Sequence, residues 1–470
     1  MIFRIYLLSL GLIAIMAYSA SHAAIPITGS AADSTATRPR GVPEKPADLG
    51  QAQWTALQNE VAQTLAGSTK LTASDGTAGN DFGWSVALSG TTALIGAYTK
   101  NDYQGAAYVF TFNGSSWVQQ QELTGNDGAA NDGFGYSVAL SGTTALIGAN
   151  QKTFGSNVAQ GAAYVFTFNG STWTQQQELT ANDGAAYYVF GTSVALSGNT
   201  ALVGAADVPL DTFYSSTYPG KAYIFTLNDG TWTQQQELTA SDGVVGDQFG
   251  YSVALSGTTA LVGAEYKTIG SNAGQGAAYV FTSNGSTWVQ QQKLISSDGA
   301  AYDFFGCSVA LSATTALVGA EAKTIGSNGA QGAAYVFAFN DPTWSQQQEL
   351  TANDGTAAAE FGASVALSGT TALVGASNAT SGVSGIYYGA AYAFNFSDST
   401  WVQLQKLSAS DAATANSFGV SVALSGTTAL VGASGPFEGS SDTYAGAAYV
   451  FSPIGDPIFC DGFDGSMICK

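Results

Sequence analysis

Residues 134–149 read FGYSVALSGTTALIGA, and residues 161–184 read GAAYVFTFNGSTWTQQQELTANDG. The two stretches contain four short β-type runs, SVAL, TALIGA, AAYVFTF and TWTQQQEL. Ser-Gly, Gly-Ala-Ala and Asn-Gly signals separate these runs, and such combinations favour tight turns. Four strands in a unit of about 50 residues are typical of one blade of a β-propeller.

The same unit is repeated along the 470-residue chain. The first two runs of each copy hold small and aliphatic residues, whereas the third run carries rings such as Tyr108 and Phe110. This gradient fits strands that pass from a crowded axis to a wider rim, where rings fill the core between blades. The sequence therefore predicts an all-β fold, a seven-bladed β-propeller of four-stranded blades. The copies begin at seven Phe-Gly pairs, which start at Phe82, Phe134, Phe190, Phe249, Phe305, Phe361 and Phe418.

The two ends of the chain are expected to share the last blade. The third run occurs seven times, but the fourth run with its tryptophan occurs six times, at Trp117, Trp173, Trp232, Trp288, Trp344 and Trp401. The segment from Ser68 to Gly76 matches the end of the missing seventh copy. We therefore predict that an N-terminal strand completes the final blade of a propeller over residues 67–453. Such closure leaves no open sheet edge between the first and last blades, and we expect a monomer.

The repeated text Phe-Gly-x-Ser-Val-Ala, followed by Leu-Val-Gly-Ala, resembles the FG-GAP repeat family, known from the propellers of integrin α-subunits and from exported bacterial proteins. The resemblance covers the predicted propeller. It implies a seven-bladed fold that acts in recognition or adhesion through loops on one face. It implies no reaction, and the chain is expected not to be an enzyme.

One family feature is missing. Integrin-like blades often carry an Asp-rich calcium loop between the first and second strands. This chain has Ser-Gly-Thr-Thr or a close variant there. Calcium takes about six to eight oxygen ligands, which a tight hairpin lacks. We therefore expect no cofactor and no calcium site of the family type.

A weaker cation signal precedes most Phe-Gly pairs, where an Asp-Gly is often followed by a second acid. Two carboxylates with backbone carbonyls form a candidate metal site. The alternative is a turn in which Asp bonds its own backbone and Gly takes a positive φ, and we favour this turn. The sixth copy pairs Asp354 with Glu360, and the third has Asp183 alone. The candidate metal ligands are Asp75, Asp81, Asp127, Asp132, Asp242, Asp247, Asp298 and Asp303.

The copies differ most between their second and third runs, and equivalent loops of a propeller project from the same side of every blade. Aromatic residues in these loops are candidates for stacking on sugars or anchoring a protein. The alternative is that they pack against neighbouring loops. The candidate binding residues are Phe213, Tyr214, Tyr218, Tyr387 and Tyr388. The variable segments are Tyr98 to Gln104, Asn150 to Gln160, Ala206 to Pro219, Glu265 to Gln275, Glu321 to Gln331, Ser377 to Tyr388 and Ser434 to Ala445.

The three cysteines are of two kinds. Cys460 and Cys469 lie in a C-terminal tail, residues 454–470, and we expect a local disulfide between them in an oxidising compartment. Cys307 takes a repeat position held elsewhere by residues such as Trp84 and Tyr136. A packed thiol is therefore expected there and not a nucleophile.

The N-terminus has the pattern of a secretory signal. Arg4 gives a positive start, residues 5–20 are apolar, and Ser21-His22-Ala23 supplies small residues for cleavage. Residues 1–23 are thus a predicted signal peptide, and the protein is expected in a secreted, periplasmic or cell-surface location. Residues 24–66 form a Pro/Ala-rich leader that is compatible with a short helix near its end. No later segment has the length and apolarity of a transmembrane helix.

Composition excludes several chemistries. His22 is the only histidine and would leave with the signal, and no arginine follows Arg40. Catalytic triads, histidine metal sites and guanidinium clamps are therefore not expected in the mature chain. The formal charge of −20 opposes binding to nucleic acid, so a partner should be neutral or cationic.

These observations favour a non-catalytic binding or adhesion module for a protein or glycan ligand, acting through the variable loops. The alternatives are a passive structural scaffold of the envelope and a glycan-active enzyme. The enzyme is the weakest, because every candidate acid belongs to a repeated turn and no copy is visibly specialised. A catalytic site would instead show acids that converge near the centre with perturbed pKa values.

The predicted signal peptide can be tested directly. When the whole chain is expressed in a host that secretes it, the purified protein should begin at Ala24. Intact-mass analysis and N-terminal sequencing measure this directly. A product that retains Met1 would contradict the assignment of residues 1–23.

Overall fold

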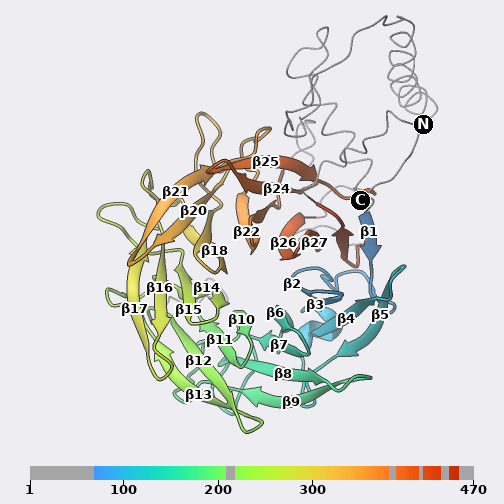
Figure 1. The fold of residues 1–470 in the computed structure, drawn as a ribbon. Coiled ribbons are helices and arrows are strands. Elements are labelled where there is room, and N and C mark those ends of the chain that lie inside the picture. Colours follow the sequence, from blue (N-terminus) through green and yellow to red (C-terminus); the bar gives the residue numbers. More distant parts are fainter. Residues whose placement is uncertain (1–67, 208–217, 380–387, 412–416, 436–443, 455–470) are drawn as a thin grey trace, which may run out of the picture. The chain divides into compact units, whose positions relative to one another are not determined.

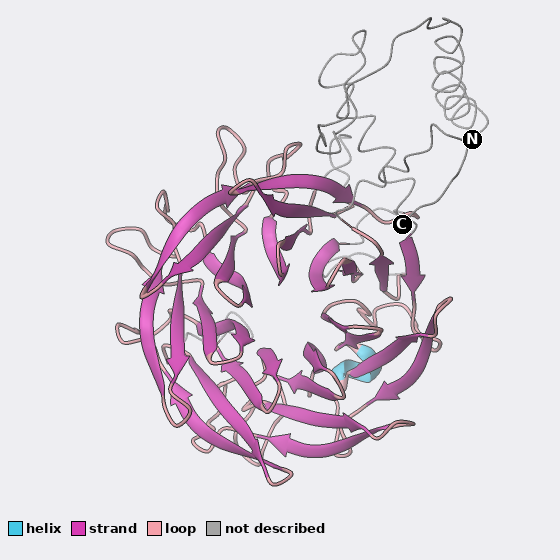
Figure 2. Cartoon of the chain, in the orientation of Figure 1, coloured by secondary structure: helices cyan, strands magenta, loops and turns pink. Residues whose placement is uncertain are grey.

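The structure is a computed structural model that describes residues 68–207, 218–379, 388–411, 417–435 and 444–454. The described strands form seven separate antiparallel sheets of four strands each. In Figure 1 these sheets stand around a common centre, with the first strand of each repeat innermost. Figure 2 shows that the described part is almost entirely strand and loop. The predicted all-β, seven-bladed propeller is confirmed.

Each blade follows the chain from the centre to the rim. The first blade is β2 (Val86–Ser89), β3 (Thr92–Ala97), β4 (Ala106–Phe112) and β5 (Trp117–Leu123). The second is β6 (Phe134–Ser141), β7 (Thr144–Ala149), β8 (Ala162–Phe168) and β9 (Trp173–Leu179). The third is β10 (Ser193–Ser197), β11 (Thr200–Ala205), β12 (Lys221–Asn228) and β13 (Thr231–Leu238). The fourth is β14 (Phe249–Ser256), β15 (Thr259–Ala264), β16 (Ala277–Ser283) and β17 (Trp288–Leu294).

The remaining blades have the same plan. The fifth is β18 (Phe305–Ser312), β19 (Thr315–Ala320), β20 (Ala333–Asn340) and β21 (Thr343–Leu350). The sixth is β22 (Phe361–Ser368), β23 (Thr371–Ala376), β24 (Ala390–Ser397) and β25 (Thr400–Leu407). The seventh is β26 (Phe418–Ser425), β27 (Thr428–Ala433), β28 (Ala447–Phe451) and the N-terminal β1 (Ser68–Leu71). A single helical turn, α3 (Lys100–Tyr103), lies in the first variable loop.

The N-terminal strand closes the ring as the repeat count requires. β1 pairs with β28, with Lys70 opposite Tyr449 and Leu71 opposite Ala448. In the sixth blade Lys406 stands opposite Tyr392 in the same way, so β1 takes the place of a fourth strand. The predicted closure is confirmed.

Two glycines of each repeat let neighbouring blades touch through their backbones. Gly148, near the end of β7, faces the carbonyl of Gly191 in the next blade, and a Cβ atom on Gly148 would lie 2.1 Å from that oxygen. Gly191 has a φ of +94°, which side chains rarely adopt. The Ser137 hydroxyl donates a hydrogen bond of 2.7 Å to the same carbonyl. The Phe-Gly and Gly-Ala dipeptides therefore exist because two backbones meet where they occur.

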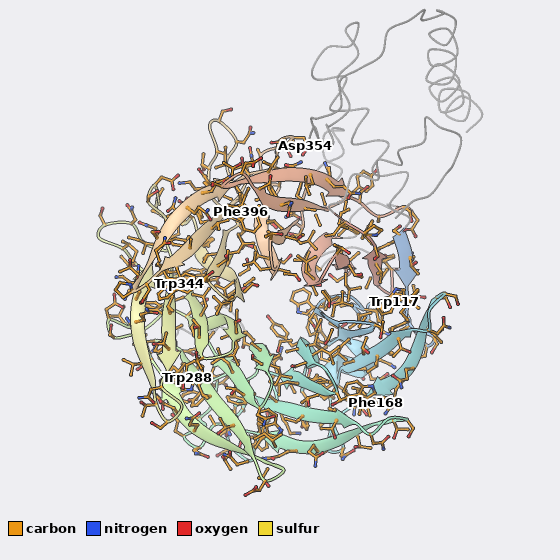
Figure 3. All side chains as sticks on the ribbon, in the orientation of Figure 1. Trp117, Phe168, Trp288, Trp344, Asp354 and Phe396 are labelled. Carbon is orange, nitrogen blue, oxygen red and sulfur yellow. The ribbon has the colours of Figure 1, made fainter. Side chains whose placement is uncertain are left out.

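The aromatic residues of the repeats pack between blades. The Phe134 ring contacts the rings of Tyr164 and Phe166 with centroid distances of 5.4 and 6.0 Å, and all three are buried. Further out, the rings of Phe168 and Trp173 lie 5.4 Å apart. Figure 3 shows Phe168 together with Trp288 and Trp344, the equivalents of Trp173 in two other blades, on the outer two strands of their blades. The prediction that the rings of the third strand are core is confirmed for Tyr108 and Phe110, whereas Phe112 is 38% exposed.

The loops between the second and third strands and the connections from one blade to the next lie on the same side of the ring, which we call the variable-loop face. The second strand of each blade ends there, and the next Phe-Gly strand begins there. In the first two blades the amide of Phe134 donates to the carbonyl of Gln104 at 3.1 Å, and that of Asn131 donates to Asp102 at 3.0 Å. The variable loops and the Asp-Gly connections are therefore neighbours, while the Ser-Gly hairpins lie on the opposite side.

The blade contact predicts a steric effect of one methyl group. Gly148→Ala should lower the free energy of unfolding by about 1–3 kcal/mol, because its Cβ would overlap the carbonyl of the next blade. Gly329→Ala is the matched control, since nothing lies within 4 Å of a Cβ there. Denaturant unfolding of both variants measures the difference. Equal stabilities would show that the blades separate without cost.

Candidate functional site

The Asp-Gly connections hold an ion pair and a tyrosine, which together we call the latch. In the second blade the hydroxyl of Tyr164 donates to Asp127 Oδ1 at 2.9 Å, and Lys152 Nζ lies 2.9 Å from Asp127 Oδ2. Asp127 follows the outer strand of the first blade, whereas Tyr164 lies on β8 of the second. The latch therefore ties one blade to the next. Figure 3 shows Asp354, the equivalent residue of the sixth blade, toward the rim and away from the centre.

Every blade has this arrangement. All eight lysines within the described ranges form ion pairs with a latch aspartate, at Lys70, Lys100, Lys152, Lys221, Lys267, Lys293, Lys323 and Lys406. The aspartates bonded by a tyrosine hydroxyl are Asp75, Asp127, Asp183, Asp242, Asp298, Asp354 and Asp411. The aspartates of the repeated Asp-Gly turns are therefore structural.

The paired acids predicted as metal ligands are brought together, but around a lysine. Lys152 contacts both Asp127 and Asp132. Two further pairs behave alike, Asp242 with Asp247 around Lys267 and Asp298 with Asp303 around Lys323.

The first blade differs in its second acid. Lys100 contacts Asp75 and Glu122. A metal ion at any of these loops would have to displace the ammonium group. Among the described residues, no three His, Cys, Asp or Glu side chains are placed to hold a metal ion.

The latch shifts the titration of its carboxylates. Partial burial alone would raise the pKa of Asp127, but hydrogen bonds from Lys152 and Tyr164 and the lysine charge outweigh it and lower that pKa. The pKa values of Asp75, Asp183, Asp242, Asp298 and Asp411 are lowered in the same way. A carboxyl whose pKa is lower in the folded state stabilises the fold above its unfolded pKa. That stability is lost as the pH falls through the folded pKa.

Removing one latch hydroxyl tests this role. Tyr164→Phe should lower the free energy of unfolding by about 1–2 kcal/mol, since a buried hydrogen bond to a carboxylate is lost while the ring stays. Tyr302→Phe is the control, because that side chain is 59% exposed and makes no hydrogen bond among the described residues. Urea unfolding at pH 7 compares the two. A larger effect at Tyr302 would contradict the latch.

The predicted rim aromatics fall into two groups. Phe213, Tyr214 and Tyr387 lie outside the described residues, as do Cys460 and Cys469. Tyr218 is half-buried, and its ring packs 4.6 Å from that of Tyr188. Tyr388 is also half-buried. For Tyr218 the structure shows the packing that was the alternative to an exposed ligand platform.

Three repeat positions on the variable-loop face surround the centre of the ring. The first axial position follows Phe-Gly and holds Trp84, Tyr136, Thr192, Tyr251, Cys307, Ala363 and Val420. The second follows the Gly-Ala of the second strand and holds Tyr98, Asn150, Ala206, Glu265, Glu321, Ser377 and Ser434. The third precedes Phe-Gly and holds Asp81, Gly133, Val189, Gln248, Phe304, Glu360 and Ser417. Unlike the rest of the repeat, these positions differ in chemistry from blade to blade.

The first two blades place four rings together, which we call the axial aromatic cluster. Trp84 lies 4.9 Å from Tyr98 and 5.7 Å from Tyr136 between ring centroids. Tyr98 also contacts Tyr136 at 5.4 Å and the exposed Tyr103 at 6.1 Å. These rings come from two blades and from the first variable loop.

Blades four to six place carboxyl groups at the same positions, and we call Glu265, Glu321 and Glu360 the axial acidic site. Burial raises the pKa of Glu265 well above its usual range, and the charge of Glu321 adds to this. Burial and the charge of Glu360 raise the pKa of Glu321 to about 7. Glu360 accepts a hydrogen bond of 2.9 Å from the Ser377 hydroxyl.

The acidic site and the aromatic cluster interact electrostatically, although they come from different blades. Burial and the charge of Glu265 raise the pKa of Tyr136 to about 12, so the two side chains are close enough to interact. The charge of Glu265, together with burial, raises the pKa of Tyr251. A further group of rings adjoins the acids, with Tyr266 and Phe304 4.9 Å apart and Tyr302 6.3 Å from Phe304.

Cys307 is buried at the first axial position, with 7% of its surface exposed. Burial raises the pKa of its thiol, and the charges of Glu321 and Glu265 add to this. A thiol held protonated is a poor nucleophile. The predicted packed thiol is confirmed.

Sequence reasoning missed the axial acids. The interpretation that no copy is specialised was wrong, because Glu265 and Glu321 were taken only as loop starts. The signal was available in the repeat itself. A position that varies in chemistry between strictly repeated strands is free of the packing that fixes its neighbours, and it lies where all blades meet.

Comparison with known families agrees with this architecture. The model of the FG-GAP repeat matches residues 67–110, 117–166, 173–225, 232–281, 288–337, 344–394 and 401–451. The chain belongs to the FG-GAP repeat family. Each match begins on the outer strand of one blade and ends on the third strand of the next. A search of the curated proteins found no match, and the described part of this FG-GAP protein has no helix long and apolar enough to cross a membrane.

Proposed function

We propose that this FG-GAP propeller is an exported, non-catalytic binding module that recognises a protein or glycan ligand at the centre of its variable-loop face. The observation that supports this most is the axial aromatic cluster. Trp84, Tyr98 and Tyr136 are half-buried, and Tyr103 is exposed beside them. Aromatic rings that remain partly open to solvent are the usual anchors of sugars and protein partners.

The cluster is not needed for the core. Each blade already fills its interior with the phenylalanine and tyrosine rings of the repeat, as Phe134 and Tyr164 do. Four of the seven blades, the third and the fifth to seventh, carry no aromatic ring at the first or second axial position, and the fourth carries one, Tyr251. Rings at these positions are therefore a local specialisation on a shared scaffold.

The acidic site favours a second candidate function. Glu321 has a pKa of about 7, and Glu360 lies close enough to raise it. A protonated carboxyl beside a second acid is the arrangement that glycoside hydrolysis uses. A glycan-active enzyme is therefore the alternative.

Binding arrays test the proposal. The exported chain is applied to arrays of glycans and of extracellular proteins, and hits are measured by calorimetry. Tyr98→Ala with Tyr136→Ala should lower the affinity for such a ligand about tenfold or more. The reason is that removal of an aromatic anchor from an interface commonly costs more than about 1.4 kcal/mol of binding free energy. Phe112→Ala with Val118→Ala is the control, since these exposed side chains lie on β4 and β5 away from the axis.

The outcomes separate the candidates. A hit weakened by the axial pair and not by the control supports recognition at the centre. Equal binding by both variants would place recognition elsewhere, and binding to nothing would favour a passive scaffold. Shortened glycans in the same reactions, seen by mass spectrometry, would favour the enzyme.

A further inference from the structure

Positive charge is distributed unevenly in the described structure. Its eight lysines all pair with latch aspartates, and it contains no arginine. Glu265 and Glu321 have no such partner, because neither an ion pair nor a hydrogen bond reaches their carboxyl groups from the described residues. Glu265 is 6% exposed. A buried carboxylate without a counter-charge is costly unless something else supplies the charge.

Two buried amide oxygens at the axial positions also lack donors. Gln248 Oε1 and Asn150 Oδ1 have no hydrogen-bond partner, and their side chains are 6% and 3% exposed. The backbone at Gln248 has a φ of 58°, as Glu360 has 57° at the same repeat position. Gln248 occupies the third axial position of the fourth blade, the blade that also carries Glu265.

Asn150 occupies the second axial position of its blade, as Glu265 does. The axial positions thus include a buried acid without a counter-charge and two buried amide oxygens without donors. Groups of this kind are normally satisfied in native proteins, so an unsatisfied set points to a missing partner. That partner has to donate hydrogen bonds and carry positive charge.

The rings beside the acids narrow the chemistry. Organic cations are attracted to the faces of tryptophan and tyrosine rings. Trp84, Tyr98 and Tyr136 supply such faces. The charge of Glu265 contributes to the raised pKa of Tyr136. A metal ion would gain nothing from the rings, whereas an ammonium group on a carbon skeleton uses both kinds of contact.

We infer that the axial acidic site binds the protonated primary amino group of a ligand, with Glu265 and Glu321 as counter-charges and the aromatic cluster against its carbon skeleton. This inference rests on the proposed function and names the chemistry of its ligand. The shared chemistry is an alkylammonium group. An amino sugar and a lysine side chain are its two sources.

The pH dependence of such binding follows from the groups that face the site. Glu360, Cys307 and Tyr251 surround the two acids and carry no positive charge. The pKa values of Glu265 and Glu321 are raised, that of Glu321 to about 7, so a fall in pH favours the neutral acids, which cannot pair with a cation. Binding of a lysine-containing ligand, whose amine remains charged, should therefore tighten between pH 5 and pH 8.

Calorimetry with paired probes tests the inference on the exported chain. The first pair is a glucosamine tetramer and its fully N-acetylated form, and the second is a tetrapeptide with one central lysine and its Nε-acetylated form. In each pair acetylation removes the charge alone. Binding of at least one amine should be weakened about tenfold or more by acetylation and by Glu265→Gln with Glu321→Gln. The pair that responds identifies the source.

A charge-matched control removes non-specific attraction to this acidic protein. Asp229→Asn with Asp398→Asn makes the same change in net charge at exposed hairpins away from the site. This control should bind the amine as the unaltered chain does, and thermal unfolding checks that all variants fold. Equal weakening by both double variants, or no preference for amines over acetylated forms, would overturn the inference. If array ligands still depend on Tyr98 and Tyr136, that result leaves the proposed function intact.

Discussion

Direct backbone contact between blades is the constraint on which this propeller depends. At each boundary a glycine of one second strand faces a glycine carbonyl of the next blade, with Gly148 and Gly191 as the example. No side chain fits between them, so adjacent inner strands converge and their outer strands spread. The widening space is then filled by the phenylalanine, tyrosine and tryptophan rings of the repeat. The same arrangement of strands thus requires glycine in the Phe-Gly and Gly-Ala dipeptides and aromatic residues on the third strand.

The latches add a charged layer outside this contact, and they explain where function is placed. Each latch holds a lysine against an aspartate and a tyrosine hydroxyl, as Lys152 does with Asp127 and Tyr164. Because the described lysines are committed to these latches, none of them pairs with Glu265 or Glu321. Glu265 and Glu321 lie where the blades meet and the repeat no longer dictates the side chain. Structural order at the rim thus leaves unbalanced acids at the centre.

Sequence alone predicted the architecture well, because the segment that forms a blade is repeated seven times along the chain. Blade number, strand order and the N-terminal strand follow from counting copies. The site was harder to predict. Loop aromatics such as Tyr218 were singled out because they are conspicuous in the text, yet Tyr218 packs on Tyr188. Glu265 and Tyr136 are far apart in sequence and belong to non-adjacent blades, so only the folded ring shows that the charge of one acts on the other. The lysine between paired aspartates was missed because it comes from a different loop.

The family repeat and the blade are out of step by one strand. Each repeat therefore begins with the outer strand of the preceding blade and ends on a blade that still lacks its own outer strand. A gene that duplicated or lost one whole copy would encode a chain whose first strand still fits its last vacancy. The pairing of the two terminal strands is then kept when a copy is added or lost, whereas the number of blades in the ring changes. Families built in this way can explore rings of different size without evolving a new way to join their ends.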